Sequence, residues 1–101
     1  MGDSSFDWDD DDIRRERGKA RELRKTEWWK RQTARCECHY CRGKFPAADL
    51  TMDHIVPLVR GGKSTKGNVV PCCKECNSRK QSLLPLEWAG YLDELARRTL
   101  A

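Results

Sequence analysis

The chain has 101 residues, of which 36% are charged and 38% hydrophobic, and its formal net charge is +4. A chain of this length forms one domain with a modest hydrophobic core, because very small domains bury only ~60% of their unfolded surface. It contains no apolar run of the ~18 residues that a membrane-spanning helix needs, and its first residues lack the basic and apolar segments of a signal peptide. We therefore expect a small domain in the reducing cytoplasm.

The charge is unevenly distributed along the chain. Residues 1–12 hold six of the 16 acidic residues and no Lys or Arg, so residues 13–101 carry 20 basic against 10 acidic side chains. Such a basic body is expected of a protein that binds a polyanion. We expect residues 1–12 to form a disordered, solvated tail. Weak competition of this tail with nucleic acid for the basic body is the alternative.

Residues 13–35 are rich in helix-forming residues and follow an Asp run, which favours a helix N-terminus. They predict a basic helix, with ten Lys or Arg against three Glu, that could follow a phosphate backbone. Trp28 and Trp29 are expected to pack in the small core rather than stack on bases. The candidates for nucleic-acid contact in this helix are Arg24, Lys30 and Arg31.

Residues 36–84 contain all six cysteines and two strand-like runs, at 50–56 and 68–70. Because a Gly-rich segment joins these runs, they predict a β-hairpin. Residues 74–83 have the composition of a helix, and the two adjacent cysteines before them mark the turn into it.

The last segment, residues 85–101, opens with Pro85, which is favourable in the first turn of a helix. Four apolar residues then recur at helical spacing and predict a helix over 85–100 that covers the core of the same domain. They are Trp88, Tyr91, Leu92 and Leu95.

Four of the six cysteines form two Cys-x2-Cys pairs separated by 31 residues. Each pair can direct two thiolates at one ion, and two pairs complete a tetrahedron, so the spacing predicts a closed structural Zn²⁺ site. The predicted ligands are Cys38, Cys41, Cys73 and Cys76. A rubredoxin-like iron centre is the alternative for the same thiolates, although the basic body argues against an electron carrier.

The other Cys and His residues narrow the class of zinc protein. Cys36 and Cys72 have less favourable spacings for chelation and are expected to be bystanders, and His39 is expected to be an exposed turn residue. A zinc finger of the Cys2His2 type needs two histidines about four residues apart, which the chain lacks. Zinc deaminases need Glu two residues after a histidine, and neither His39 nor His54 has one.

The order of these motifs resembles that of the HNH endonuclease family. The matching segments are CHYC at 38–41, LTMDHIVPLVRGG at 50–62 and GNVVPCCKECNSRK at 67–80. The resemblance covers about residues 36–82. It implies an α+β fold of the ββα-metal type, in which a hairpin lies on a helix and the zinc ligands clamp the ends of the motif. It also implies metal-dependent hydrolysis of phosphodiester bonds in DNA, by nicking or by double-strand cleavage.

The resemblance assigns catalytic roles to four residues. His54 would be the general base that deprotonates the attacking water, for which an imidazole with a pKa of ~6.5 is suited. Asp53 and Asn77 would hold a catalytic cation, Mg²⁺ or Mn²⁺, through hard oxygen atoms. Asn68 would brace the loop and hold the orientation of the imidazole. Because adjacent side chains of a regular strand point to opposite faces, the strand is expected to bend or end at Asp53 and His54.

The helix after the second cysteine pair departs from the family at one position. The family usually has His where this chain has Asn77, and an amide oxygen shifts the metal preference towards Mg²⁺ and Mn²⁺. Capping of the helix after Cys76 is the purely structural alternative for Asn77. Arg79 and Lys80, one turn further along, are expected to contact the phosphate backbone.

A zinc-ribbon module that binds nucleic acid without cleaving it remains the alternative function. Strong sequence preference would need a homodimer or a protein partner, because the chain is short for a second DNA-reading domain. Small members of the family that resemble this chain are often bacterial or phage-borne.

Overall fold

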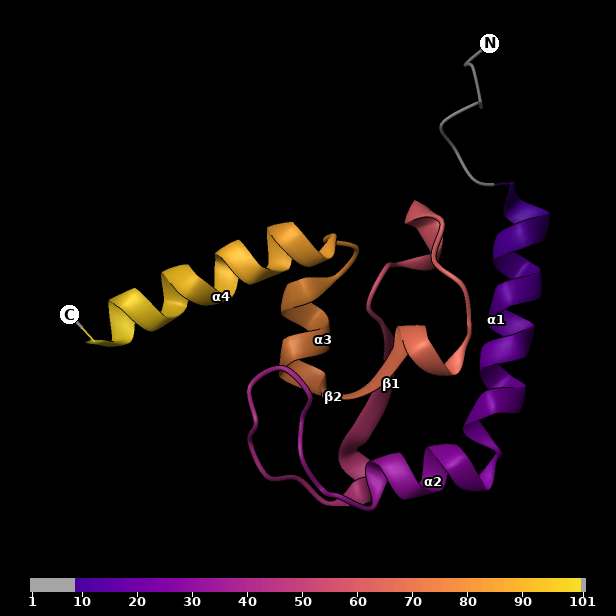
Figure 1. Cartoon of the computed structure of the whole chain (residues 1–101), viewed down its shortest axis with the longest axis horizontal. Helices are drawn as coiled ribbons and strands as arrows, with labels where there is room; N and C mark the ends of the chain where they lie inside the picture. Colours follow the sequence, from indigo (N-terminus) through magenta and orange to yellow (C-terminus); the bar gives the residue numbers. More distant parts are fainter. Residues whose placement is uncertain (1–8, 101) are drawn as a thin grey trace, which may run out of the picture.

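The structure is a computed structural model that describes residues 9–100. This range contains four α-helices and one two-stranded antiparallel sheet (Figure 1). In chain order the elements are α1 (Asp10–Arg24), α2 (Glu27–Thr33), β1 (Leu50–His54), β2 (Val69–Cys73), α3 (Lys74–Lys80) and α4 (Pro85–Leu100). Short 3-10 helices lie at Ala47–Asp49, Leu58–Arg60 and Lys66–Asn68. The fold is α+β with a small ββα core, as predicted.

The ββα core consists of the predicted hairpin and the helix that follows it. β1 and β2 pair with Leu50 opposite Cys73 and His54 opposite Val69. α3 packs against both strands and contacts the face of β1 that carries Thr51 and Asp53. Since side chains alternate along a strand, His54 at the end of β1 points to the other face, towards α1. β1 ends at His54, as expected, but both residues lie within the strand, so the side chains of Asp53 and His54 still point to opposite faces.

The bounds of the strands and of α3 differ from the expected ones. β2 runs through the two adjacent cysteines, which were expected to form a turn, and β1 and α3 end earlier than predicted. Pro71 is tolerated within β2 because the strand lies at an edge, where a missing N–H costs no ladder hydrogen bond. The Pro71 carbonyl accepts a hydrogen bond from the backbone N–H of His39 at 2.9 Å.

The prediction of a single basic helix over residues 13–35 is wrong, because the helix is interrupted at Lys25 and Thr26. Thr26 is the N-cap of α2: its Oγ1 accepts a hydrogen bond from Trp29 N at 3.2 Å and donates one to the Leu23 carbonyl at 2.7 Å. A threonine with these two bonds satisfies the ends of both helices and favours a turn over a continuous helix. α1 consequently stands beside the hairpin while α2 runs across its end (Figure 1).

The expectation of a disordered tail is wrong for residues 9–12, which form the N-cap and the first turn of α1. The carboxylate of Asp9 caps the helix by accepting a hydrogen bond from Asp11 N at 2.9 Å, and the next three Asp residues lie in the positive first turn. The part of the expected tail at residues 1–8 lies outside the described residues, as does residue 101.

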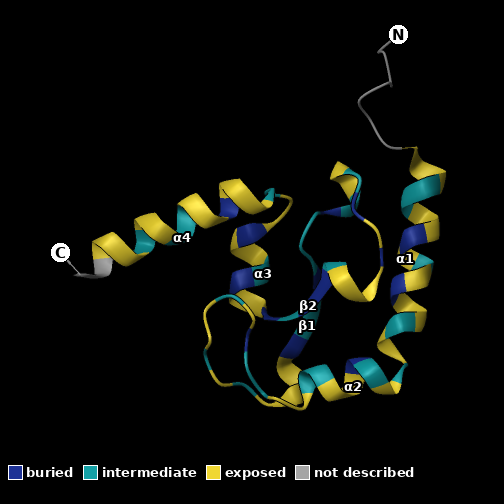
Figure 2. Cartoon of the chain, viewed as in Figure 1, coloured by how far each residue is buried: buried dark blue, intermediate teal, exposed yellow. Residues whose placement is uncertain are grey.

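The hydrophobic core gathers where the hairpin, α3 and the start of α4 meet (Figure 2). Trp88 of α4 is 3% exposed and packs on the buried cysteines, with Tyr91 and Leu92 beside it, as the helical spacing predicted. Trp29 is buried as expected, whereas Trp28 is half-buried.

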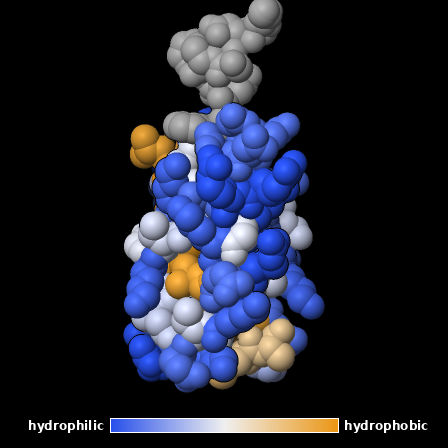
Figure 3. Space-filling model, turned by 90° about the vertical axis from the view of Figure 1, so that its right-hand side faces the viewer, coloured by the Kyte–Doolittle hydropathy of each residue, from blue (hydrophilic) through white to orange (hydrophobic). Residues whose placement is uncertain are grey.

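The side of the molecule formed by α1 is largely hydrophilic (Figure 3). The exposed basic residues of this helix are Arg14, Arg15, Arg17, Lys19, Arg21 and Arg24. Of the described helices, none is both long and apolar enough to cross a membrane.

Candidate active site

The four cysteines of the two pairs form one cluster, in which all Sγ atoms lie within 4.8 Å of one another. The sulfurs of Cys41 and Cys73 are 3.9 Å apart. Four bonds of ~2.3 Å in a tetrahedron put the sulfurs about 3.8 Å apart, so the cluster fits one tetrahedral metal ion. Cys38 and Cys41 belong to the loop before the hairpin, Cys73 ends β2, and Cys76 lies in α3. An ion bound here would tie the loop before the hairpin to the junction of β2 and α3.

Backbone N–H groups point at the sulfurs of this cluster. Tyr40 N donates to Cys38 Sγ, Gly43 N to Cys41 Sγ and Cys76 N to Cys73 Sγ, each at 3.4 Å. Burial raises the pKa of the Cys38 thiol, but the backbone N–H groups outweigh it and bring the pKa down to about 7. Donors aimed at a sulfur favour its thiolate form, which is the form that binds metal.

The remaining residues of the cysteine region lie as expected. Cys36 and Cys72 are free thiols outside the cluster, and His39 is exposed on the turn between Cys38 and Cys41. The N-cap of α3 is Cys73, whose sulfur accepts from Cys76 N. Capping of this helix is therefore not the role of Asn77.

Asp53 is buried in a polar triad that spacing alone did not reveal. Its Oδ2 accepts a hydrogen bond from the hydroxyl of Tyr40 at 2.6 Å and lies 3.2 Å from Lys80 Nζ. Lys80 Nζ also donates to the carbonyl of His54 at 3.0 Å. Burial and the bond to Asp53 raise the pKa of Tyr40, so the phenol stays protonated and donates. Tyr40 thus connects the first cysteine pair to Asp53.

Lys80 lies inside the protein, which corrects the expectation that it contacts the phosphate backbone. The residue has 0% exposure, and its ammonium compensates the buried carboxylate of Asp53. A buried charge is tolerated only when it is paired and hydrogen-bonded. Arg79, the other predicted phosphate contact of α3, is exposed and forms an ion pair with Glu75 at 2.7 Å.

Asn77 lies on the side of α3 that faces β1, one helical turn before Lys80. Its Nδ2 donates a hydrogen bond to Thr51 Oγ1 at 2.9 Å, which directs the amide nitrogen towards the strand. The hydrogen bond and ion pair of Asp53 both use Oδ2. These contacts do not use the Oδ1 atoms of Asp53 and Asn77, and carboxylate and amide oxygens are hard donors of the kind that suits Mg²⁺ or Mn²⁺.

The half-buried imidazole of His54 points away from this triad. Its Nε2 lies 2.9 Å from the hydroxyl of Ser64, in the loop between the strands. Burial lowers the pKa of His54, the charge of Asp53 opposes this shift, and the charge of Arg24 adds to it. A lowered pKa keeps the ring neutral at pH 7, which is the form that can accept a proton.

Asn68 braces the loop that carries Ser64. Its Oδ1 accepts from Val56 N at 2.9 Å, and its Nδ2 donates to the carbonyls of Val56 at 3.1 Å and Lys63 at 2.8 Å. At Gly62 a Cβ atom would lie 1.7 Å from the Val56 carbonyl oxygen, so a larger residue at this position would force the backbone to shift. The imidazole of His54 is bonded by Ser64 rather than by Asn68, and no spacing in the sequence indicated Ser64.

The predicted nucleic-acid contacts of the first two helices are exposed. Arg24 lies in the last turn of α1, close enough to His54 to influence its pKa. Lys30 and Arg31 lie on α2, and Lys30 pairs with Glu27 at 3.4 Å.

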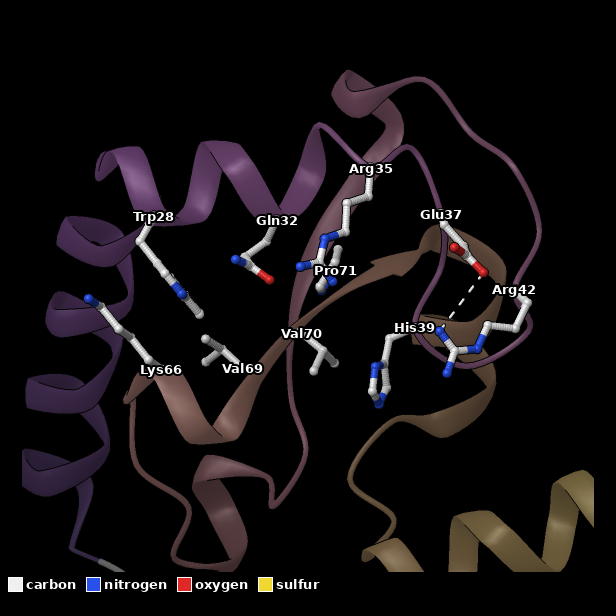
Figure 4. A pocket seen from close by; sticks show the side chains of 10 residues that line it. All are labelled: Trp28, Gln32, Arg35, Glu37, His39, Arg42, Lys66, Val69, Val70 and Pro71. Carbon is white, nitrogen blue, oxygen red and sulfur yellow. Dashed lines mark ion pairs between the residues drawn. The ribbon is translucent and has the colours of Figure 1, made fainter.

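A cationic groove of about 260 Å³ lies between α2 and the Cys38–Cys41 loop, above β2 (Figure 4). Trp28, Arg35 and Lys66 line one part of it, and Lys66 Nζ is 5.6 Å from the centroid of the Trp28 ring. Arg42, at the other end, lies 3.9 Å from Glu37. Val69, opposite His54 in the sheet, also lines the groove.

A family model described as HNH endonuclease matches residues 38–88. The matched segment contains the cysteine cluster together with Asp53, His54, Asn68 and Asn77, and it leaves out α1 and α2. The chain belongs to the HNH endonuclease family. A search of curated proteins finds none that matches it.

Proposed function

We propose that this protein is a metal-dependent endonuclease that hydrolyses phosphodiester bonds in DNA and is stabilised by a Zn²⁺ ion in the cysteine cluster. The observation that carries the proposal is the family match, because a single matched segment holds both the four-cysteine cluster and His54. The half-buried imidazole, whose pKa is lowered by burial, supports a general base that works at neutral pH.

Each polar residue of the site then has a chemical task. His54 would accept the proton of the attacking water, and Asp53 and Asn77 would hold Mg²⁺ or Mn²⁺ through side-chain oxygens. Such a cation, when bound, would supply Lewis-acid stabilisation of the phosphate and of the leaving 3′ oxygen. Lys80 and Tyr40 keep the carboxylate of Asp53 fixed by binding its other oxygen.

A plasmid assay tests this function. Zinc-loaded protein is expected to convert supercoiled plasmid to nicked or linear DNA when Mg²⁺ or Mn²⁺ is added. A chelator too weak to remove the Zn²⁺ should stop cleavage while the protein stays folded, because the two metal sites have different ligands. The rival function, a zinc-ribbon module, predicts DNA binding without cleavage at any divalent cation concentration.

The cationic groove above β2 is the surface that we assign to a DNA strand. Arg35, Arg42 and Lys66 give it three cations against the single Glu37, and Val69 brings it next to the catalytic end of β1. Cations in a groove bind phosphates and position the backbone, whereas they read no sequence.

Arg35→Glu is therefore expected to weaken DNA binding. It should also make the plot of the logarithm of the association constant against the logarithm of salt concentration less steep, by about 0.9 for each phosphate that the groove no longer neutralises. Binding is measured by fluorescence anisotropy at several salt concentrations without catalytic metal. Arg97→Glu on exposed α4 changes the net charge equally and is the matched control. An equal decrease of affinity and of salt slope in both variants would rule out a specific role of the groove.

A further inference from the structure

The hydroxyl of Ser64 determines which nitrogen of His54 carries the proton. Ser64 Oγ lies 2.6 Å from the backbone carbonyl of Glu16 and 2.9 Å from His54 Nε2. A carbonyl oxygen only accepts hydrogen bonds, so the single hydroxyl proton of Ser64 is donated to Glu16. Nε2 must then carry a proton and donate it to Ser64 Oγ. The lone pair of the neutral imidazole therefore lies on Nδ1.

Glu16 holds Ser64 by two groups at once. Besides its carbonyl, its carboxylate Oε1 accepts a hydrogen bond from Ser64 N at 2.7 Å. This bond lowers the pKa of Glu16 against the effect of burial, and Lys19 lies 3.2 Å from the other carboxylate oxygen. Glu16 and Ser64 are 6% and 8% exposed. The buried carboxylate of Glu16 thus binds the loop beside His54 through one oxygen and Lys19 of α1 through the other.

The loop is held from its other side by the hairpin, since the Asn68 amide binds the carbonyl of Lys63, the residue before Ser64. Ser64 is therefore fixed between α1 and the end of the sheet. Its position cannot change without breaking bonds on both sides.

We infer that Glu16 and Ser64 are positioning residues, through which α1 fixes the His54 imidazole with its proton on Nε2 and its basic Nδ1 available to water. The choice of tautomer follows from the hydrogen bonds alone. Its catalytic consequence rests on the proposed function. α1 lies outside the segment at residues 38–88 that matches the family model. The proposed general base is therefore oriented by a helix that is not part of that segment.

Nitrogen-15 NMR of the full zinc-loaded chain at alkaline pH tests the hydrogen bond directly. His39→Gln leaves His54 as the single histidine and assigns its signals. We expect a proton on Nε2 that exchanges slowly with water, because it is bonded to Ser64. In Ser64→Ala this proton should exchange rapidly, and cleavage should fall by up to about 100-fold, as expected when a reacting group is misplaced.

Two comparisons separate positioning from general damage to the fold. Thr65→Ala removes the neighbouring exposed hydroxyl and should change neither signal nor rate. Glu16→Gln keeps an oxygen that can accept from Ser64 N and should preserve the slow exchange of the Nε2 proton. Glu16→Ala loses this acceptor, so the proton should exchange faster with water. Zinc content verifies that each variant is folded.

A proton on Nδ1 in the wild type, or an Nε2 proton equally protected in Ser64→Ala, would overturn the inference. Because the exchange measurement needs no cleavage, it stands even if the protein is not a nuclease. Conversely, if the plasmid is cleaved while the NMR result is negative, only the positioning role is refuted.

Discussion

Cys38→Ser is expected to leave the protein unfolded at room temperature. A structural Zn²⁺ site supplies an apparent ~10–16 kcal/mol of folding free energy, whereas a whole domain is stable by only ~5–15 kcal/mol. The buried cluster where the hairpin, α3 and α4 meet consists of four cysteines, three of them predicted ligands, with Trp88 packed on them. Loss of one ligand therefore removes both the metal and the framework of the core. The measurements are zinc content and thermal unfolding followed by circular dichroism.

Cys36→Ser is the matched control for this experiment. Cys36 lies two residues from Cys38 and is also a free thiol, but its sulfur is outside the cluster. This variant should keep one Zn²⁺ and the melting temperature of the wild type. Equal melting temperatures of Cys38→Ser and the wild type would refute a structural metal site. A coloured protein would assign the cluster to iron instead, because Zn²⁺ complexes of thiolates are colourless.

The hairpin, the cysteine cluster and the apolar face of α4 could be predicted because local patterns carry them. Two Cys-x2-Cys pairs indicate a metal site by their spacing, and a Gly-rich segment between two strand-like runs leaves few alternatives to a hairpin. The packing of Trp88, Tyr91 and Leu92 follows from helical periodicity alone.

The interruption between α1 and α2 could not be predicted from composition, because it depends on the hydrogen bonds of one side chain, Thr26. Summed helix propensity favours one helix over residues 13–35, but Thr26 caps α2 and ends that run. The Asp run was similarly ambiguous, because the same residues suit a solvated tail and a helix N-terminus. In the structure Asp9 caps α1, which stabilises the helix at the Asp run.

The site contains contacts that no local pattern could reveal. Lys80 follows Asn77 by one helical turn, and because it is charged it was expected to lie on the surface. Tertiary packing instead buries it against Asp53. Tyr40 lies 13 residues from Asp53, and Glu16 lies 48 residues from Ser64. These pairs form only when the hairpin closes and α1 docks beside it, so only the folded structure identifies them.

His54→Ala is expected to lower the rate of DNA cleavage by ~10²–10⁴, the range that general-base catalysis contributes. The fold should persist, because the half-buried ring lies outside the cysteine cluster and the Asp53 triad. The wild-type rate should also fall on acidification only below the usual imidazole range, since burial lowers the pKa of His54 and protonation removes the base. His39→Ala removes the other, exposed histidine, which lines the groove assigned to DNA, and at saturating DNA it should retain the wild-type rate.

The rate of plasmid cleavage by zinc-loaded wild type and His54→Ala in the same Mg²⁺ buffer tests the central claim most directly. The account predicts rapid cleavage by the wild type, almost none by the variant, and equal zinc content and DNA affinity for both. If the purified variant cleaves as fast as the wild type, His54 is not the general base and the proposed chemistry is wrong.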